Sequence, residues 1–274
     1  MGIFDNLCEI EKAGSLESSY EQLKSYIIDW ICKKFNLDDI YKKRRICVDM
    51  STIPPTVDYD GDLYADHDIT SLCNNRMFQW GKVKGKFSCA FCKSLESLEG
   101  APKEVGEEFN CTDCDSLKSL KGAPEKTMHF ICADCDNLKS LEGAPKEVRG
   151  SFDCSFCYSL TNLKGAPEKV IGYFSCHYCV SLKTLEGSPN EVRRYFGCSH
   201  CNLLTSLEGS PKYVGGNFDC RGCVSLKNLE GSPKYVGGNF NCRECVSLKN
   251  LEGAPKNIIG LIDCSQCGSL ILNE

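Results

Sequence analysis

Cysteine residues recur along most of this chain in a fixed frame. Nine Cys-x-x-Cys pairs begin at Cys89, Cys111, Cys132, Cys154, Cys176, Cys198, Cys220, Cys242 and Cys264, and seven of the eight intervals between them are 22 residues, the other being 21. Around the pairs recurs the pattern Val-x-Gly-x-Phe-x-Cys-x-x-Cys-x-Ser-Leu-x-x-Leu-x-Gly-Ala/Ser-Pro. A period of this length indicates one coil per repeat, stacked so that neighbouring coils bury a common interior.

Within each coil, the Phe-x-Cys segment predicts a short strand. Side chains in a strand point alternately to its two faces, so the Phe and the Cys share the buried face. Leu-x-x-Leu then turns the chain. The Pro that follows places that corner outside the sheet, because Pro cannot donate a ladder hydrogen bond. Stacked coils therefore give a parallel sheet of about ten strands, at roughly 4.8 Å per strand.

The N-terminal residues follow a different pattern. Apolar residues recur there at helical spacing, with Ser15 as N-cap and Asn36 as C-cap: Leu16, Tyr20, Leu23, Ile27, Trp30, Ile31 and Phe35. A second short helix is predicted from Asp38 through Arg45. Residues 1–50 are therefore predicted to form a helical cap, 51–86 a degenerate capping repeat without Cys pairs, and 87–274 the nine regular repeats.

The order of buried positions resembles a known family. Phe-x-Cys-x-x-Cys-x-Ser-Leu resembles the leucine-rich repeat frame Leu-x-Leu-x-x-Asn/Cys-x-Leu. Corners such as Gly100-Ala101-Pro102-Lys103 resemble the short leucine-rich repeats of tailed-bacteriophage proteins and, more distantly, those of secreted bacterial effectors. The resemblance covers about residues 53–274, and the second Cys stands where those phage repeats usually carry Asn.

This resemblance implies an α/β-solenoid, a leucine-rich repeat arc of about ten short parallel strands with an N-terminal helical cap. It implies a non-enzymatic protein-binding scaffold, and a phage-encoded inhibitor or modulator of a host defence protein acting through the concave face. The N-terminus lacks a basic segment followed by a long apolar stretch, so we expect a cytoplasmic protein without a secretory signal or a membrane partner.

The Cys pairs admit two interpretations. Between successive pairs lie 17 or 18 residues, which falls within the spacing of four-cysteine zinc sites. However, a strand Cys and a turn Cys lie on successive steps of a coil, and free Cys packs well as a small buried hydrophobe. We therefore expect a packing role, with no metal or cofactor and, in a reducing cytosol, no disulfides. A multi-site zinc-binding or redox protein is the alternative.

Function is sought in the positions that vary between coils. Aromatic and His residues gather in three consecutive coils with Arg residues nearby, and the predicted partner-binding residues are Phe156, Tyr173, His177, Tyr178, Arg193, Arg194, Tyr195, His200, Arg221 and Arg243. Rigid aromatics with Arg are typical of protein-binding hot spots. Aromatic pairing across a polar sheet face is the structural alternative. Nucleic-acid binding by tyrosine stacking is a third possibility, disfavoured by the net charge of −5.

No catalytic constellation is evident. His177 and His200 lack a carboxylate in their own coils and a Ser or Cys nucleophile motif, so we expect no enzyme activity. The final coil has no obvious polar cap, and its apolar residues are Ile258, Ile259, Leu261, Ile262, Leu270, Ile271 and Leu272. An open solenoid end normally needs such a cap, so this edge is predicted to pair with a partner or to form a homodimer.

Overall fold

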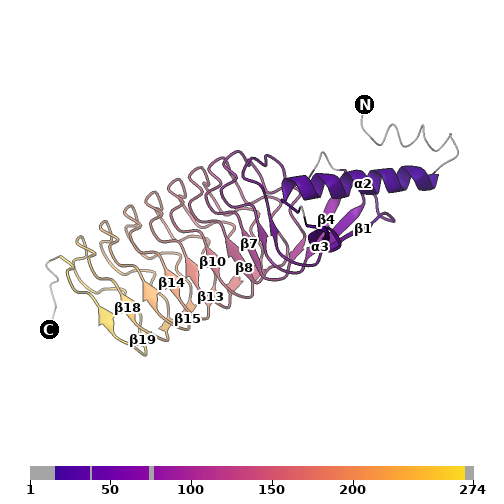
Figure 1. The fold of residues 1–274 in the computed structure, drawn as a ribbon. Coiled ribbons are helices and arrows are strands. Elements are labelled where there is room, and N and C mark those ends of the chain that lie inside the picture. Colours follow the sequence, from indigo (N-terminus) through magenta and orange to yellow (C-terminus); the bar gives the residue numbers. More distant parts are fainter. Residues whose placement is uncertain (1–15, 38, 74–76, 269–274) are drawn as a thin grey trace.

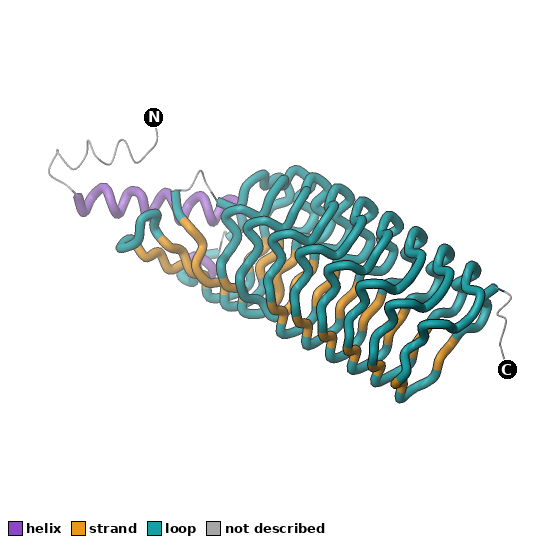
Figure 2. Tube along the Cα trace, turned by 180° about the vertical axis from the view of Figure 1, so that it is seen from behind, coloured by secondary structure: helices purple, strands orange, loops and turns teal. Residues whose placement is uncertain are grey.

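The computed structural model describes residues 16–37, 39–73 and 77–268, which form a solenoid of stacked coils (Figure 1). Helix α2 (Leu16–Lys34) lies across the N-terminal coils. Rows of short strands run along one side of the stack, and loops close each coil on the other side (Figure 2).

The principal sheet has ten parallel strands, one per coil. The strands are β3 (Leu63–Tyr64), β5 (Phe87–Ser88), β7 (Glu108–Asn110), β8 (His129–Ile131), β10 (Phe152–Asp153), β12 (Phe174–Ser175), β14 (Phe196–Gly197), β16 (Phe218–Asp219), β18 (Phe240–Asn241) and β20 (Ile262–Asp263). Each Phe pairs in register with the Phe of the next coil, as Phe174 does with Phe196. The predicted solenoid of about ten parallel strands is confirmed.

A second row of strands was not predicted. It is formed by the Val position of each frame, in β6 (Glu104–Val105), β9 (Glu147–Val148), β11 (Lys169–Val170), β13 (Glu191–Val192), β15 (Tyr213–Val214), β17 (Tyr235–Val236) and β19 (Asn257–Ile258). Six of these strands, β9, β11, β13, β15, β17 and β19, make a parallel sheet. Strand β6 instead joins β4 (Gln79–Val83), β2 (Thr56–Tyr59) and β1 (Ile46–Asp49), and β1 runs antiparallel to β2. The Pro does lie outside the sheets, but the chain returns to a strand within three residues.

The one 21-residue interval interrupts this second row. Its coil carries Thr127 in place of Val, and one residue fewer separates Thr127 from Phe130 than in the neighbouring coils. Only an isolated bridge, Glu104 to Lys126, remains there, and the next sheet begins at β9. The shortened corner therefore divides the second row of strands while the principal sheet continues through it.

The interior consists of repeated columns. The Phe rings of successive coils stack with centroids 5.1–5.6 Å apart and interplanar angles of at most 18°. Two Leu columns and the Cys columns complete a core that is fully buried through most coils. Each coil thus buries the same side chains against its neighbours, as a solenoid requires.

The N-terminal cap closes the first coils. Ile27, Ile31 and Phe35 are buried, and the ring of Phe35 lies 5.5 Å from that of Trp80 and 5.6 Å from that of Phe87. Asn36 takes a left-handed φ of 50° just beyond α2, whereas Ser15 lies outside the described residues.

The second helix, α3, covers only Ile40–Lys43, shorter than the expected Asp38–Arg45, and is capped by Asp39. None of its residues is buried, so packing does not extend it.

Candidate functional site

The second Cys of each pair forms a ladder of hydrogen bonds through the core. Its Sγ donates to the backbone carbonyl of the first Cys in the preceding coil, for example from Cys157 to Cys132 at 3.2 Å. The same bond recurs in eight coils, from Cys114 to Cys267, at 2.9–3.3 Å. A thiol is a weak donor, yet here it satisfies a buried carbonyl.

Two thiols of this ladder, those of Cys157 and Cys179, are held in their protonated form, because burial raises their pKa well above the usual value. No two cysteines in the described ranges are joined by a disulfide. Within those ranges, no group of three or more His, Cys, Asp or Glu side chains is placed to hold a metal ion. Zinc binding by these pairs would require the ladder thiols to lose both a proton and a hydrogen bond to a carbonyl.

Several of the varying positions are structural caps. The side chain between Phe and the first Cys accepts from the backbone amide two residues later, as Asp153 does from Ser155 at 2.9 Å and Asn241 from Arg243 at 3.0 Å. Such local bonds fix the turn that follows each strand. Variation in this column therefore reflects turn geometry, and the candidate binding residues lie before and after it.

The third residue of each Cys-x-x-Cys adopts a left-handed conformation. Phe156, Tyr178 and His200 have φ values of 61°, 57° and 58°, and Gly222 occupies the same position in the next coil. Bulky residues are uncommon in this region because of steric strain. The three rings, which we name the turn stack, lie face to face, 4.9 Å apart from Phe156 to Tyr178 and 4.5 Å from Tyr178 to His200.

A chain of polar contacts holds His177 and Tyr195 on the sheet face. The Tyr195 hydroxyl lies 3.0 Å from Nε2 of His177 and donates to the Asp219 carboxylate at 3.1 Å. On the other side of the ring, Nδ1 of His177 accepts from the backbone amide of Ser199 at 3.1 Å. Nδ1 is therefore unprotonated and Nε2 carries the hydrogen that Tyr195 accepts. Burial lowers the pKa of His177, which keeps this ring neutral.

Gly197 makes this arrangement possible. A Cβ at Gly197 would lie 2.3 Å from the imidazole of His177, whereas most other coils carry Ser, Asn or Asp there. His177 in turn supplies the cap on Ser199 that the missing side chain cannot make. Gly197, at a position where most coils carry a polar side chain, is the sequence feature that indicates the contact between His177 and the next coil.

The contact partners of His177 come from neighbouring coils, so they could not be found within its own coil. The Ser199 hydroxyl also contacts Nδ1 of His177, but Ser199 is only 3% exposed. A buried hydroxyl cannot reach a substrate, so this grouping of Ser, His, Tyr and Asp orders the sheet face.

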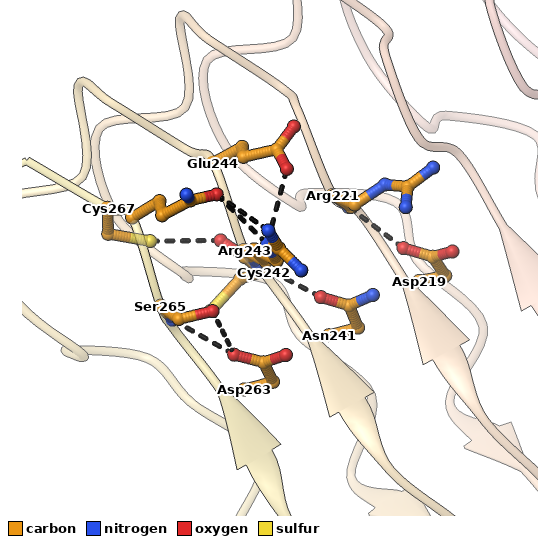
Figure 3. A network of polar contacts seen from close by, with 10 residues as sticks. Asp219, Arg221, Asn241, Cys242, Arg243, Glu244, Asp263, Ser265 and Cys267 are labelled. Atoms are coloured by element: carbon orange, nitrogen blue, oxygen red, sulfur yellow. Dashed lines mark hydrogen bonds and ion pairs between the residues drawn. The ribbon is translucent and has the colours of Figure 1, made fainter.

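The four predicted Arg residues have different surroundings. Arg193 pairs with Glu191 at 2.9 Å, and Arg194 is exposed. Arg243 bonds the Gln266 side chain at 3.0 and 2.9 Å and pairs with Glu244 at 3.2 Å (Figure 3). Arg221, one coil earlier, has a buried Nε with no hydrogen-bond partner.

The ten predicted residues form two groups at opposite ends of the short strands. Tyr173, Arg193, Arg194 and Tyr195 precede the strands of the principal sheet. The turn group follows the strands and comprises Phe156, His177, Tyr178, His200, Arg221 and Arg243. The Tyr195–His177 contact connects the two groups across the face.

Sequence reasoning missed two aromatic residues on the second row of strands. Tyr213 and Tyr235 stack 4.9 Å apart with their rings nearly parallel, and Tyr213 pairs in register with Glu191, the partner of Arg193. The repeated Tyr-Val dipeptide is the sequence feature that indicates this pair of rings, but the corner that contains it was not predicted to form a sheet. A hollow of about 440 Å³ begins at Tyr195 and is lined further by Asn217, Phe218, Asp219, Asn239, Asn241, Leu261, Ile262 and Asp263.

Comparisons with known proteins add one structural likeness. No family model and no curated protein matches the chain. Among solved structures it is similar to a leucine-rich repeat protein from Bacteroides ovatus, at 14% identity and a TM-score of 0.29, over 80% of this chain and 89% of that one. Neither described helix combines the length and apolar character needed to span a bilayer. The described residues form a parallel β-solenoid with a short helical cap at its N-terminal end.

Proposed function

We propose that this chain is a non-enzymatic protein-binding scaffold, and that it is a phage-encoded modulator of a host defence protein. The binding role is supported by the rigid repeat core, which leaves the exposed positions free to vary. The phage origin and the host partner rest on the resemblance of the Gly-Ala-Pro-Lys corners to phage repeats.

The observation that carries the binding role is a set of exposed residues that we name the corner patch: Tyr173, Arg193, Arg194 and Tyr213. Tyr173 and Tyr213 are 42% and 41% exposed, and both belong to or adjoin strands fixed by the core. Tyr and Arg are the residue types most enriched at hot spots. The Tyr213 ring is already held by stacking on Tyr235, so binding costs little side-chain entropy.

The hollow that begins at Tyr195 lies beside the corner patch. It opens beside Tyr195 and crosses the later coils, where its lining is mostly amide and carboxylate side chains. A protein partner can place an aromatic anchor on the corner patch and polar groups over the hollow, the usual division between the core and the rim of an interface.

The test compares affinity capture from a candidate host by the wild-type chain and by a Tyr173→Ala, Arg194→Ala, Tyr213→Ala variant. Truncating hot-spot residues costs at least about 2 kcal/mol, roughly thirtyfold in affinity, so the variant should lose the partner. Tyr64→Ala is the control, since Tyr64 is an exposed tyrosine on β3, at the far end of the principal sheet from the corner patch.

Equal capture by all three proteins would contradict the assignment of binding to the corner patch. Capture of nucleic acid with a steep loss at higher salt would contradict the protein-binding proposal itself.

A further inference from the structure

The side chains in the turns that follow the principal strands change along the solenoid, from acidic to aromatic and then to Arg. Counting coils from the Cys89 pair, coils two and three carry four carboxylates around the Cys pairs, Asp113, Asp115, Asp134 and Asp136. Coils four to six carry the turn stack. Coil seven carries Arg221, and coil eight carries Arg243 followed by Glu244. We name this row of turns the turn edge.

The order is symmetric about coil five, where Tyr178 lies. Asp134 and Asp136 are two coils before it and Arg221 is two coils after it, while Asp113 and Asp115 are three before and Arg243 three after. Regular strand pairing keeps the coils at a constant spacing. A half-turn about an axis through Tyr178 therefore places Asp134 and Asp136 of one copy opposite Arg221 of another. The outer turns are not complementary in the same way, because Arg243 already pairs with Glu244 at 3.2 Å.

The inner members of this pattern lack partners within the chain. Among the described residues, Asp134 and Asp136 form no ion pair, whereas Asp113 and Asp115 share Lys93 at 3.3 and 3.2 Å. Arg221 forms none either, and its buried Nε has no acceptor. Burial and the neighbouring Asp113 carboxylate raise the pKa of Asp134, so a cation here would relieve repulsion. The unpaired acids and the unpaired Arg are the groups that the half-turn brings together.

The centre of the turn edge is apolar and flat. Phe156 and Tyr178 are each 38% exposed although they stack on one another, and Tyr158 beside them is also exposed. Gly222 shows that the turn accepts a residue without a side chain. The bulky left-handed rings are thus not required by the turn, and they present a surface suited to burial against another flat surface.

We propose that two copies of this chain associate antiparallel through the turn edge, with the two-fold axis at Tyr178 and with Arg221 of each copy facing Asp134 and Asp136 of the other. A self-complementary patch of this kind is what an isologous two-fold interface requires. The dimer leaves the corner patch accessible, because Tyr173 and Arg194 lie at the opposite end of the strands.

The decisive experiment mixes two charge-reversed proteins in sedimentation velocity at micromolar concentration. The wild-type chain should sediment as a dimer. Arg221→Glu alone and the Asp134→Arg, Asp136→Arg variant alone should each weaken dimerisation at least tenfold, since each places like charges opposite one another. Mixed one to one, they should form a heterodimer, because both contacts across the two-fold axis are then between opposite charges.

Two control variants keep the result interpretable. Arg194→Glu changes the same net charge away from the turn edge and should leave the dimer intact. Leu261→Lys places a charge on the apolar final coil, where Leu261 is 77% exposed. A wild-type monomer at all concentrations, failure of the mixed pair to associate, or a dimer lost only with Leu261→Lys would each overturn the proposal. Partner capture by the corner patch is measured separately and can fail or succeed independently.

Discussion

Replacing Cys157 by Ala tests whether the thiol ladder contributes hydrogen bonds in addition to packing. Cys157 donates to the Cys132 carbonyl at 3.2 Å, and both residues are fully buried. The matched control is Cys132→Ala. It removes the same side-chain atoms from the same core, but the Cys132 thiol donates to no carbonyl within the described residues, and the Cys132 backbone carbonyl stays bonded to Cys157.

The two variants share the cost of a small cavity and lost burial, so their difference isolates the hydrogen bond. An orphaned buried carbonyl costs about 1–3 kcal/mol, and a thiol donor places the value toward the lower end of that range. For a chain of this size, each kcal/mol corresponds to about 2–4 °C in Tm. The free energy of unfolding of Cys157→Ala should therefore be about 1 kcal/mol below that of Cys132→Ala, which corresponds to at least about 2 °C in Tm.

The assay is guanidinium unfolding under reducing conditions, followed by circular dichroism. Solenoids can lose coils in stages, so the denaturant slope of each variant must match the wild type before free energies of unfolding are compared. Equal destabilisation of the two variants, within about 0.5 kcal/mol, would refute the hydrogen-bonding role and leave the ladder as packing alone.

Three further results are expected. Phe91→Gly should raise the free energy of unfolding by about 0.5–1 kcal/mol, since Phe91 has a φ of 64°, while Gly222→Ala should lower it by about 1 kcal/mol; both are measured by urea unfolding. Burial lowers the pKa of His177 below its usual 6.5, so the unfolded state takes up the proton first and the free energy of unfolding should fall as pH drops below about 6.5. In urea titrations at pH 7.5 and 5.5, His177→Gln should show a smaller fall than the wild type. An unchanged pH profile would contradict the buried neutral ring. Metal analysis of the purified protein should find well under one zinc per chain, and stoichiometric zinc in several sites would contradict the packing role of the Cys pairs.

The repeated interior could be predicted from the sequence because the same buried residue types recur at the same positions in every coil. The phase that aligns Phe174 with Phe196 is visible in the spacing alone, and the strands follow from it. The second row of strands could not be found in the same way. Each coil supplies a single buried Val there, such as Val192. A single apolar residue cannot show the alternation of apolar and polar residues that predicts a strand.

The surface was harder to predict because its contacts cross between coils. Tyr195 has the composition of a binding residue, yet its hydroxyl connects His177 and Asp219, which are 18 and 24 residues away. Tyr173, which has the same position one coil earlier, is free to meet a partner. The difference depends on Gly197, whose missing side chain admits the imidazole ring. Composition identified the region, and only cross-coil geometry separates an ordering residue from an exposed one.

The single shortened coil has a consequence for how the molecule unfolds. In the described structure no strand pairing joins Lys126 to Glu147, so this boundary lacks the second row of strands. The coils there are joined by the principal sheet and by single bonds such as that from the Gly150 amide to the Met128 carbonyl at 2.6 Å. In a linear array each coil is stabilised by its neighbours, and the weakest junction sets where cooperativity divides. We expect the helix-capped coils up to the Cys132 coil and the coils from Cys154 onward to behave as two cooperative units. Deleting a single residue from one repeat is thus enough to give a uniform stack an internal boundary.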